Sequence, residues 1–376
     1  MYDALVVGLG AMGSAAVYHL ASRGATVVGI DAFDPPHGLG STHGRSRIIR
    51  EAYYEHPSYV PLVQRAYAGW AALERDAGVA LFLRTGGLNI GAPDCGLVVG
   101  ALASATRHGL GVDLLSASEI ERRFPAFRLE PHMVGVFERS AGMLFPEACI
   151  RAYLFLARSL GAELRTKTRV LGLERTSDAI TATIHDGAIT ARRVIVCAGA
   201  WTKPLLQTLG IDAPLDVARQ TMHWLDQRGD AVVRSADRFP VALIEHDADR
   251  LFYTMPDTGD GVKVAIHHEG PIVSTDSVDR SIHPSDTAPV QTLAERFIPG
   301  AGGRIRESAV CLYTNTPDRD FIIDAVAEMP NVVVVSACSG HGFKFASAIG
   351  EIAAQLCLGE ACDVDLSPFR ADRFHA

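Results

Sequence analysis

The chain has 376 residues, of which 48% are hydrophobic and 21% charged, values typical of a globular α/β protein with about two domains rather than of a disordered or fibrous one. Its formal net charge is −8 and Lys and Arg form no block, which argues against nucleic acid or an anionic membrane as a partner. Apolar runs stay below the roughly 18 residues of a membrane span, and a signal peptide's charged and apolar regions are absent from the start. We therefore expect a cytoplasmic protein, bound to no membrane or nucleic acid, whose partners are small molecules.

The first 31 residues predict a β-α-β unit. Apolar strands are expected over residues 3–8 and 25–31, with a helix over 12–23 between them. Gly24 follows the helix and is typical of a helix end. This opening is characteristic of a nucleotide-binding fold.

A glycine fingerprint joins the first strand to the helix. Its residues are Gly8, Gly10 and Gly13, and Asp31 closes the second strand. Such glycines permit a tight turn and close approach of a pyrophosphate to the helix N-terminus, while an acid at this distance accepts from a ribose hydroxyl. The alternative is an ordinary glycine-rich turn, and the fingerprint alone does not separate FAD from NAD.

Further elements follow in chain order. Helices are expected over residues 59–76, 97–108 and 147–160, a strand over 86–90, and a capping box at Ser116 and Glu119. A β-meander is expected over 164–166, 169–173, 180–184 and 188–190, then an apolar strand over 194–197. A second, antiparallel sheet is expected over 222–225, 241–245, 251–255 and 262–267. The last unit is a strand over 332–336 and a helix over 343–357.

Nucleotide-type segments at both ends and in the middle of the chain predict two interleaved domains. The fold class is therefore α/β, with a Rossmann-type domain and a substrate domain built on an antiparallel sheet with helices. We assign the nucleotide-binding domain to residues 1–84, 145–215 and 318–376, and the substrate domain to 85–144 and 216–317.

Cysteine and histidine spacing offers no metal site. The seven cysteines form no C-x-x-C pair, and an odd number in apolar segments argues against a disulfide framework. Neighbouring His267 and His268 would point to opposite faces of a strand, so zinc is not expected.

Four ordered blocks make the sequence specific. They are Asp31–His37 with Ser41–Gly44 and Arg47–Arg50; Lys263 with His267; Cys311–Thr314 with Phe321–Asp324; and Ser339–Phe345. Together they resemble the monomeric sarcosine oxidase and N-methyltryptophan oxidase family over essentially the whole chain.

The resemblance implies that the dinucleotide is FAD and that Cys311 carries it covalently. It also implies that Gly342 and Phe343 aim backbone amides at the flavin, and that His43 lies near it. The alternative for Cys311 is a buried cysteine of a strand.

The family's catalytic positions match Lys263 and Arg47 on the two faces of the flavin, with Lys263 promoting reaction with O2. His267, Tyr253 and Tyr313 match the amine side of the pocket. Arg50 and Lys344 match the pair that binds the substrate carboxylate, a role that suits charge-assisted donors. The alternatives are a surface lysine for Lys263, a structural arginine for Arg47 and a structural histidine for His267.

We therefore expect a monomeric flavin oxidase that converts an N-methyl amino acid, such as sarcosine or N-methyltryptophan, to an imine. O2 would become H2O2, and hydrolysis would release formaldehyde. A cyclic imino acid such as pipecolate or proline is the alternative substrate, and a nicotinamide-dependent dehydrogenase or a non-catalytic nucleotide-binding protein are further alternatives. The loop Glu51–His56 departs from the family, with Tyr54 where its members have glycine, which puts sarcosine itself in question.

Overall fold

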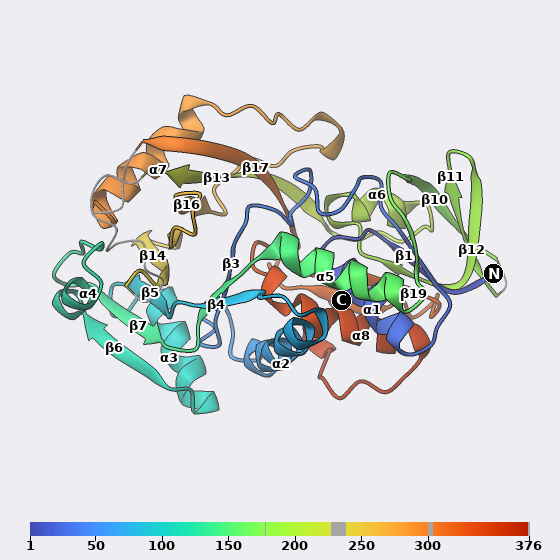
Figure 1. The fold of residues 1–376 in the computed structure, drawn as a ribbon, viewed down its shortest axis with the longest axis horizontal. Coiled ribbons are helices and arrows are strands. Elements are labelled where there is room, and N and C mark those ends of the chain that lie inside the picture. The colour runs from blue at the N-terminus through green and yellow to red at the C-terminus, as the bar shows by residue number, and fades with distance from the viewer. Residues whose placement is uncertain (177, 227–237, 300–303, 375–376) are drawn as a thin grey trace.

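The computed structural model describes residues 1–176, 178–226, 238–299 and 304–374 of the chain. It is a mixed α/β structure with two large sheets (Figure 1). Strands β5, β6, β7 and β14 lie toward one end of the long axis, and β1, β10 and β12 toward the other. No helix in these ranges is long and apolar enough to cross a membrane.

The first large sheet contains the nucleotide-type strands. Its strands are β1 (Tyr2–Val7), β2 (Val27–Ile30), β9 (Glu163–Arg165), β10 (Val170–Arg175), β11 (Ile180–Ile184), β12 (Gly187–Val196), β18 (Ile322–Ala325) and β19 (Val332–Ser336). The order β9-β2-β1-β12-β19 is parallel throughout, and β18 pairs antiparallel to β19. The sheet thus joins the start, middle and end of the chain.

Two expectations about this sheet are corrected. Strand β9 was expected in the meander, but it pairs parallel to β2, because the helix before it returns the chain to that edge. The expected strands over 188–190 and 194–197 are one strand, β12. Its first half pairs with β11, while its second half lies between β1 and β19.

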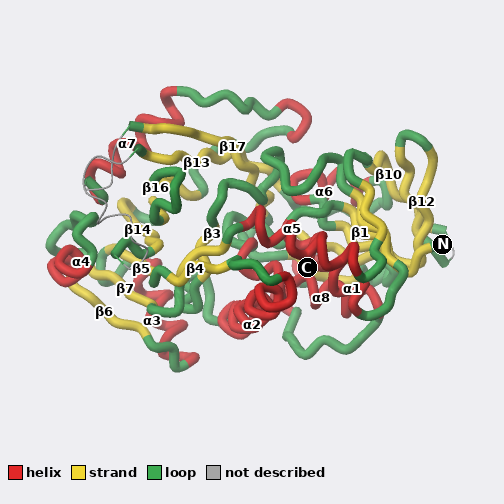
Figure 2. The backbone as a smooth tube through the Cα atoms, in the orientation of Figure 1, coloured by secondary structure: helices red, strands yellow, loops and turns green. Residues whose placement is uncertain are grey.

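Helices cover one face of this sheet (Figure 2). They are α1 (Ala11–Ser22), α2 (Tyr59–Ala77), α5 (Pro146–Ser159) and α8 (Ala346–Leu358). Side chains of β1 point alternately to the two faces of the sheet. Ala4 and Val6 pack against these helices. Leu5 and Val7 belong to the core on the other face, which β10–β12 and α6 (Thr202–Gln207) complete. Both faces are buried, as expected for parallel strands.

The second large sheet has the order β17-β13-β16-β15-β14-β5-β7-β6. The bounds are β17 (Ile305–Asn315), β13 (Asp216–Leu225), β16 (Val262–His267), β15 (Arg250–Met255), β14 (Val241–Asp247), β5 (Gly87–Gly91), β7 (Val134–Glu138) and β6 (Val112–Ser116). All neighbours are antiparallel except the parallel pair β14–β5.

Three helices accompany this sheet: α3 (Gly96–His108), α4 (Ala117–Arg123) and α7 (Pro284–Phe297). The predicted capping box is confirmed at the start of α4, where Ser116 and Glu119 each accept from the other's backbone N–H. A small sheet of β3 (Arg47–Ile49), β8 (Gly142–Leu144) and β4 (Phe82–Arg84) lies between the two large sheets (Figure 1). It places the residues after β3 at the junction.

Candidate functional site

A cavity of about 420 Å³ extends from the glycine fingerprint to the inner face of the second sheet. Most of the residues predicted for the site line it. They are Gly8, Gly10, Asp31, Arg47, Arg50, Tyr253, His267, Cys311, Tyr313, Gly342, Phe343 and Lys344. Gly13, His43 and Lys263 are not among the residues that line it. The fold therefore brings together residues that are far apart in the sequence.

The fingerprint turn fits a dinucleotide. Gly8 has φ +95°, and a Cβ there would lie 2.5 Å from the Cys197 carbonyl oxygen. A Cβ on Gly13 would lie 1.7 Å from the Gly8 carbonyl oxygen, so both positions require glycine. Helix α1 begins without a side-chain cap at Gly10, which leaves its first amides to bind a phosphate group.

Asp31 follows β2 at the rim of this turn. Its carboxylate accepts from the backbone N–H of Leu9 and of Phe33, both at 2.8 Å, and is buried with 7% exposure. The His37 ring lies 3.6 Å away. Two backbone hydrogen bonds thus fix the Asp31 carboxylate at the end of the second strand. In dinucleotide-binding folds an acid at this position accepts a hydrogen bond from a ribose hydroxyl.

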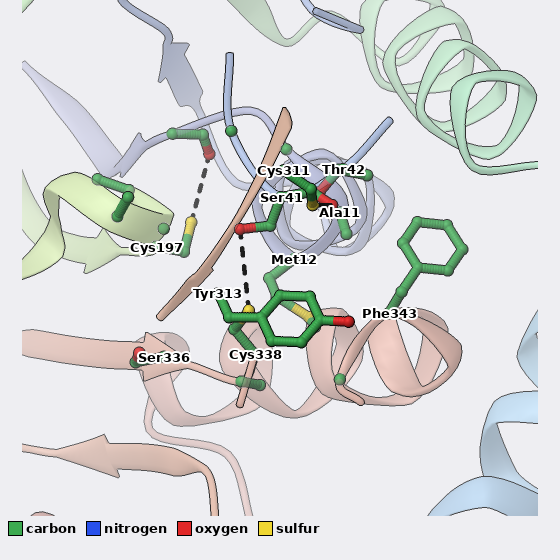
Figure 3. Close-up of a pocket in the computed structure, with 18 of the residues that line it drawn as sticks. Ala11, Met12, Ser41, Thr42, Cys197, Cys311, Tyr313, Ser336, Cys338 and Phe343 are labelled. Carbon is green, nitrogen blue, oxygen red and sulfur yellow. Dashed lines mark hydrogen bonds between the residues drawn. The ribbon is translucent and has the colours of Figure 1, made fainter. Parts of the chain in front are cut away.

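Cys311 lies in β17 beside Ser41 (Figure 3). Its Sγ is 3.6 Å from the Ser41 carbonyl oxygen and 3.9 Å from Arg47 Nη2. Burial raises the pKa of the Cys311 thiol, while Arg47 and Lys263 act in the opposite direction. Cys338, a second thiol in the same cavity, donates to Ser41 Oγ at 3.8 Å.

The segment 41–47, which we call the basic loop, carries His43 and Arg47. Arg47 donates to the carbonyl oxygens of Ser46 and Ser41 at 2.8 and 2.7 Å. His43 is buried, and its Nε2 has no partner in the described residues. Burial, followed by Arg47 and Lys263, lowers the pKa of His43 to about 4, so the ring is neutral at pH 7.

Lys263 is 1% exposed and is anchored to the basic loop. Its Nζ donates to the carbonyl oxygens of Gly44 and Ser46, both at 2.8 Å. Burial and Arg47 lower the pKa of Lys263 well below its usual value. The position and protonation of this amine thus depend on the loop.

Glu147, at the start of α5, holds the basic loop. Its Oε1 accepts from the backbone N–H of Gly44 at 2.8 Å and of Arg45 at 3.1 Å. Burial alone would raise the pKa of Glu147, but the backbone donors and Arg47 outweigh it and lower the pKa. The sequence analysis missed this residue, because an acid in the first turn of a helix is common without any further role.

Arg50 is already paired with a carboxylate of the chain. Its Nη2 lies 2.9 and 3.1 Å from the oxygens of Glu55, and its Nη1 donates to the Ala52 carbonyl oxygen at 3.1 Å. The guanidinium is 4.6 Å from the ring centre of Tyr53 and 4.8 Å from that of Tyr54. Glu55 was not predicted, although an acid five residues from a predicted carboxylate-binding arginine was a possible signal.

Lys344 lies beside this ion pair. It is 5% exposed, and its Nζ donates to the His341 carbonyl oxygen at 2.7 Å. Burial, followed by Arg50, lowers the pKa of Lys344 to about 7, and Glu55 opposes the shift. Burial alone would raise the pKa of Glu55, but Arg50, His341 and Lys344 lower it.

Tyr253, His267 and Tyr313 form a second part of the cavity wall. His267 Nδ1 lies 3.2 Å from the Tyr313 hydroxyl, and the His267 and Tyr253 rings are 6.4 Å apart. Burial and His268 lower the pKa of His267 well below its usual value. This wall therefore offers a neutral imidazole and two phenols.

The expected orientation of His267 and His268 was wrong. Strand β16 ends at His267, and His268 has φ +63°, so its ring turns back to within 4.2 Å of the His267 ring. The described residues contain no group of three or more side chains able to hold a metal ion.

Gly342 and Phe343 lie at the start of a short 3-10 helix, Phe343–Phe345, which leads into α8. The Gly342 N–H already donates to the Cys338 carbonyl oxygen at 2.9 Å. The turn itself therefore uses one of the two amides that were predicted to face the flavin. A Cβ on Gly342 would lie 1.8 Å from the Ala337 carbonyl oxygen, so the turn requires glycine here.

Comparisons with known proteins agree with this geometry. The family model for FAD dependent oxidoreductase matches residues 3–356. Monomeric sarcosine oxidase of Bacillus sp. (strain B-0618) is 38% identical, over 99% of this chain and 96% of that protein. N-methyl-L-tryptophan oxidase of Yersinia pestis (strain Pestoides F) is 34% identical, over 99% of each.

A solved structure of NikD, an amino acid oxidase of nikkomycin biosynthesis, shares the fold. Its TM-score is 0.87 at 23% identity, covering 98% of this chain and 97% of that one. The family match and the two curated relatives span nearly the whole sequence, and the fingerprint turn fits the cofactor that the family uses. The chain is therefore a member of the FAD dependent oxidoreductase family.

Proposed function

We propose that this protein oxidises a secondary, N-methylated amino acid to its imine. The observation that carries the proposal is the pair of buried cations, Arg50 and Lys344, in one cavity with the fingerprint turn and with the His267 wall. Both curated relatives named above are oxidases of N-methyl amino acids. Such a substrate has one carboxylate and one amine, which match these two sides.

The substrate carboxylate binds Arg50 and Lys344. Arg50 supplies a planar, charge-assisted donor, and Lys344 supplies a charge when protonated. Because Glu55 already occupies Arg50 Nη2 at 2.9 Å, a bound substrate shares or displaces this internal carboxylate. The site is thus kept electrically balanced while empty.

The amine lies toward His267, Tyr253 and Tyr313. His267 is neutral at pH 7 because burial lowers its pKa. Because protonating this imidazole is unfavourable, His267 favours an uncharged substrate amine and can accept a hydrogen bond from it, with the Tyr313 hydroxyl 3.2 Å from its Nδ1. An uncharged amine is the form from which hydride leaves most easily.

When bound, FAD would supply the hydride acceptor and the two-electron chemistry that reduces O2 to H2O2. Gly8, Gly10, Gly13 and Asp31 hold its dinucleotide, and we propose that Cys311 holds it covalently through a thioether. Arg47 supplies positive charge where negative charge develops, and Lys263 adds to it when protonated. Oxidation at the N-methyl carbon gives an N-methylene imine, whose hydrolysis then releases formaldehyde and the demethylated amino acid.

A peroxide-coupled screen of N-methyl and cyclic amino acids tests the proposal. We expect peroxide from an N-methyl amino acid, with formaldehyde in equal amount. Peroxide without formaldehyde, from proline or pipecolate, would point to the cyclic imino acids, which need the same carboxylate clamp. Absence of peroxide with both series would reject the oxidase. The monomeric state and the cytoplasmic location stay predictions.

A further inference from the structure

Tyr54 forms a fixed wall beside the carboxylate clamp. Its ring centre lies 4.8 Å from the Arg50 guanidinium, on which Tyr53 also packs at 4.6 Å. Tyr54 lines the cavity together with Leu243 and Tyr253. The space next to a carboxylate bound at Arg50 is therefore bounded by this ring.

The backbone of Tyr54 is pinned by helix α3. A Cβ on Gly100 would lie 2.2 Å from the Tyr54 carbonyl oxygen and 3.0 Å from its Cα, so the helix rests directly on this residue. Ser104 of the same helix donates to the Tyr53 carbonyl oxygen. These contacts make the wall part of the scaffold rather than a flap.

The residues before Tyr54 are also tied down. The buried Glu138 carboxylate accepts from the backbone N–H of Glu51 at 2.9 Å and of Ala52 at 2.8 Å. Asn89 donates to the Ala52 carbonyl oxygen at 3.4 Å. Displacing Tyr54 would thus leave a buried carboxylate without its donors, which is costly.

The ring cannot retreat sideways either. It packs against an apolar cluster in which Leu97 is 1%, Leu251 6% and Leu243 8% exposed. Close-packed interiors accept an extra ring only by straining their neighbours. The cavity beside Arg50 therefore has a fixed limit.

We propose that Tyr54 limits the size of the group on the substrate α-carbon and so determines substrate choice. This inference rests on the proposed function. The α-carbon is one bond from the carboxylate, so its substituent falls in the space that Tyr54 bounds. The substrate class is a compact secondary-amine acid, such as N-methylglycine (sarcosine) or N-methylalanine, and an indole-sized side chain is excluded. This reverses the expectation from sequence that Tyr54 counts against sarcosine.

The experiment measures binding separately from turnover. Acetate and indole-3-acetate are titrated into the yellow holoenzyme and followed by the flavin absorbance, in wild type, Tyr54→Ala, Tyr54→Leu and Tyr54→Phe. We expect wild type to prefer acetate, Tyr54→Ala to reduce that preference about tenfold or more, and Tyr54→Leu to fall between. Tyr54→Phe keeps the ring and should keep the wild-type ratio. A ratio that stays constant in Tyr54→Ala and Tyr54→Leu would overturn the inference, and so would equal affinity for both acids in wild type.

Turnover then separates the two proposals. Peroxide formation is compared for sarcosine and N-methyltryptophan, and the preference should shift toward the larger substrate in Tyr54→Ala. If wild type oxidises neither, nor any other N-methyl amino acid, the proposed function fails while the binding ratio still judges Tyr54. If wild type oxidises sarcosine but the ratios do not move, the specificity inference alone is wrong.

Discussion

Lys344 is a buried amine whose protonation state changes near neutral pH. Burial and Arg50 lower its pKa to about 7, about three units below an ordinary lysine. A carboxylate bound at the clamp favours the protonated amine. Binding above neutral pH therefore requires proton uptake, and Arg50, which stays charged, does not share this dependence.

We expect the affinity for acetate to be constant below about pH 6 and to fall with rising pH above 7, by up to about tenfold per unit. Flavin absorbance titrations between pH 6 and 9 measure this. Lys344→Met should lose the slope and, at pH 6, about 2–5 kcal/mol of binding free energy. A slope that persists in Lys344→Met would assign the titration to another group.

Cys311 is the residue expected to keep the flavin on the denatured chain. A thioether survives acid, whereas contacts through Gly8, Gly10 and Asp31 are lost with the fold. After acid precipitation, yellow colour should stay in the wild-type pellet and move to the supernatant for Cys311→Ser. Mass spectrometry of a peptide containing Cys311 should find the added flavin. A yellow wild-type supernatant would rule out covalent attachment. Flavin found on the nearby Cys338 would show that Cys338, not Cys311, is the attachment residue.

At the scale of elements, the basic loop owes its shape to one side chain from α5. Glu147 satisfies two backbone donors of the loop, and two carbonyl oxygens of the same loop hold Lys263 Nζ. None of these hydrogen bonds joins the Glu147 carboxylate directly to the Lys263 amine. The two groups act on each other through the backbone between Gly44 and Ser46 and through charge.

Glu147→Ala should therefore impair the function proposed for Lys263. We expect the yellow colour to return slowly in air after bleaching with substrate, as we also expect for Lys263→Met, which removes the amine itself. The reason is that hydrogen bonds to a charged acceptor contribute about 1.5–3 kcal/mol each. Glu147→Gln keeps an acceptor and should be slowed less. Stopped-flow measurement of the aerobic and anaerobic halves checks this. Wild-type recovery in Glu147→Ala would leave Glu147 a structural residue only.

Much of the element list followed from sequence, for physical reasons. Hydrophobic periodicity predicted β16 and β19 with the observed bounds and the long helix α2 within one residue. The strand that pairs with a given strand can lie far away in the sequence. The pairing of β9 with β2 could therefore not be predicted from the three residues of β9. The unbroken β12 was missed because Arg192 and Arg193 interrupt its apolar pattern.

The site was predicted unevenly for a similar reason. Residues in distinctive blocks, such as Arg50 and Cys311, could be assigned by resemblance to a cavity position. Glu55 and Glu147 act on residues that only the fold or the loop turn brings near them. Their carboxyl groups resemble those of any surface acid in the sequence. The positive φ of His268 likewise depends on where β16 ends.

At the scale of the whole molecule, the fingerprint helix depends on the last helix. Gly350 of α8 faces α1, and a Cβ there would lie 2.3 Å from Ala15 Cβ and 2.8 Å from the Ala15 carbonyl carbon. Helices from the two ends of the chain therefore touch through small residues directly behind the dinucleotide turn.

Gly350→Ala should lower the thermal unfolding midpoint. Alanine favours a helix by about 1 kcal/mol over glycine, but overpacking at a backbone contact costs about 1–3 kcal/mol, so the net effect is destabilising. Gly96→Ala is the matched control, because a Cβ at Gly96, also in a helix, meets nothing within 4 Å. A midpoint for Gly350→Ala at or above that of Gly96→Ala would contradict the close packing.

The order β2-β1-β12-β19 has a consequence for how the protein is made. During synthesis, β1 leaves the ribosome first, yet its neighbour β12 begins at residue 187 and β19 only at Val332. The apolar edge of β1 must therefore stay unpaired until β12 has been synthesised, and exposed strand edges invite aggregation. The dinucleotide site is completed only when α8 packs behind the fingerprint turn, so cofactor capture has to follow synthesis of this helix.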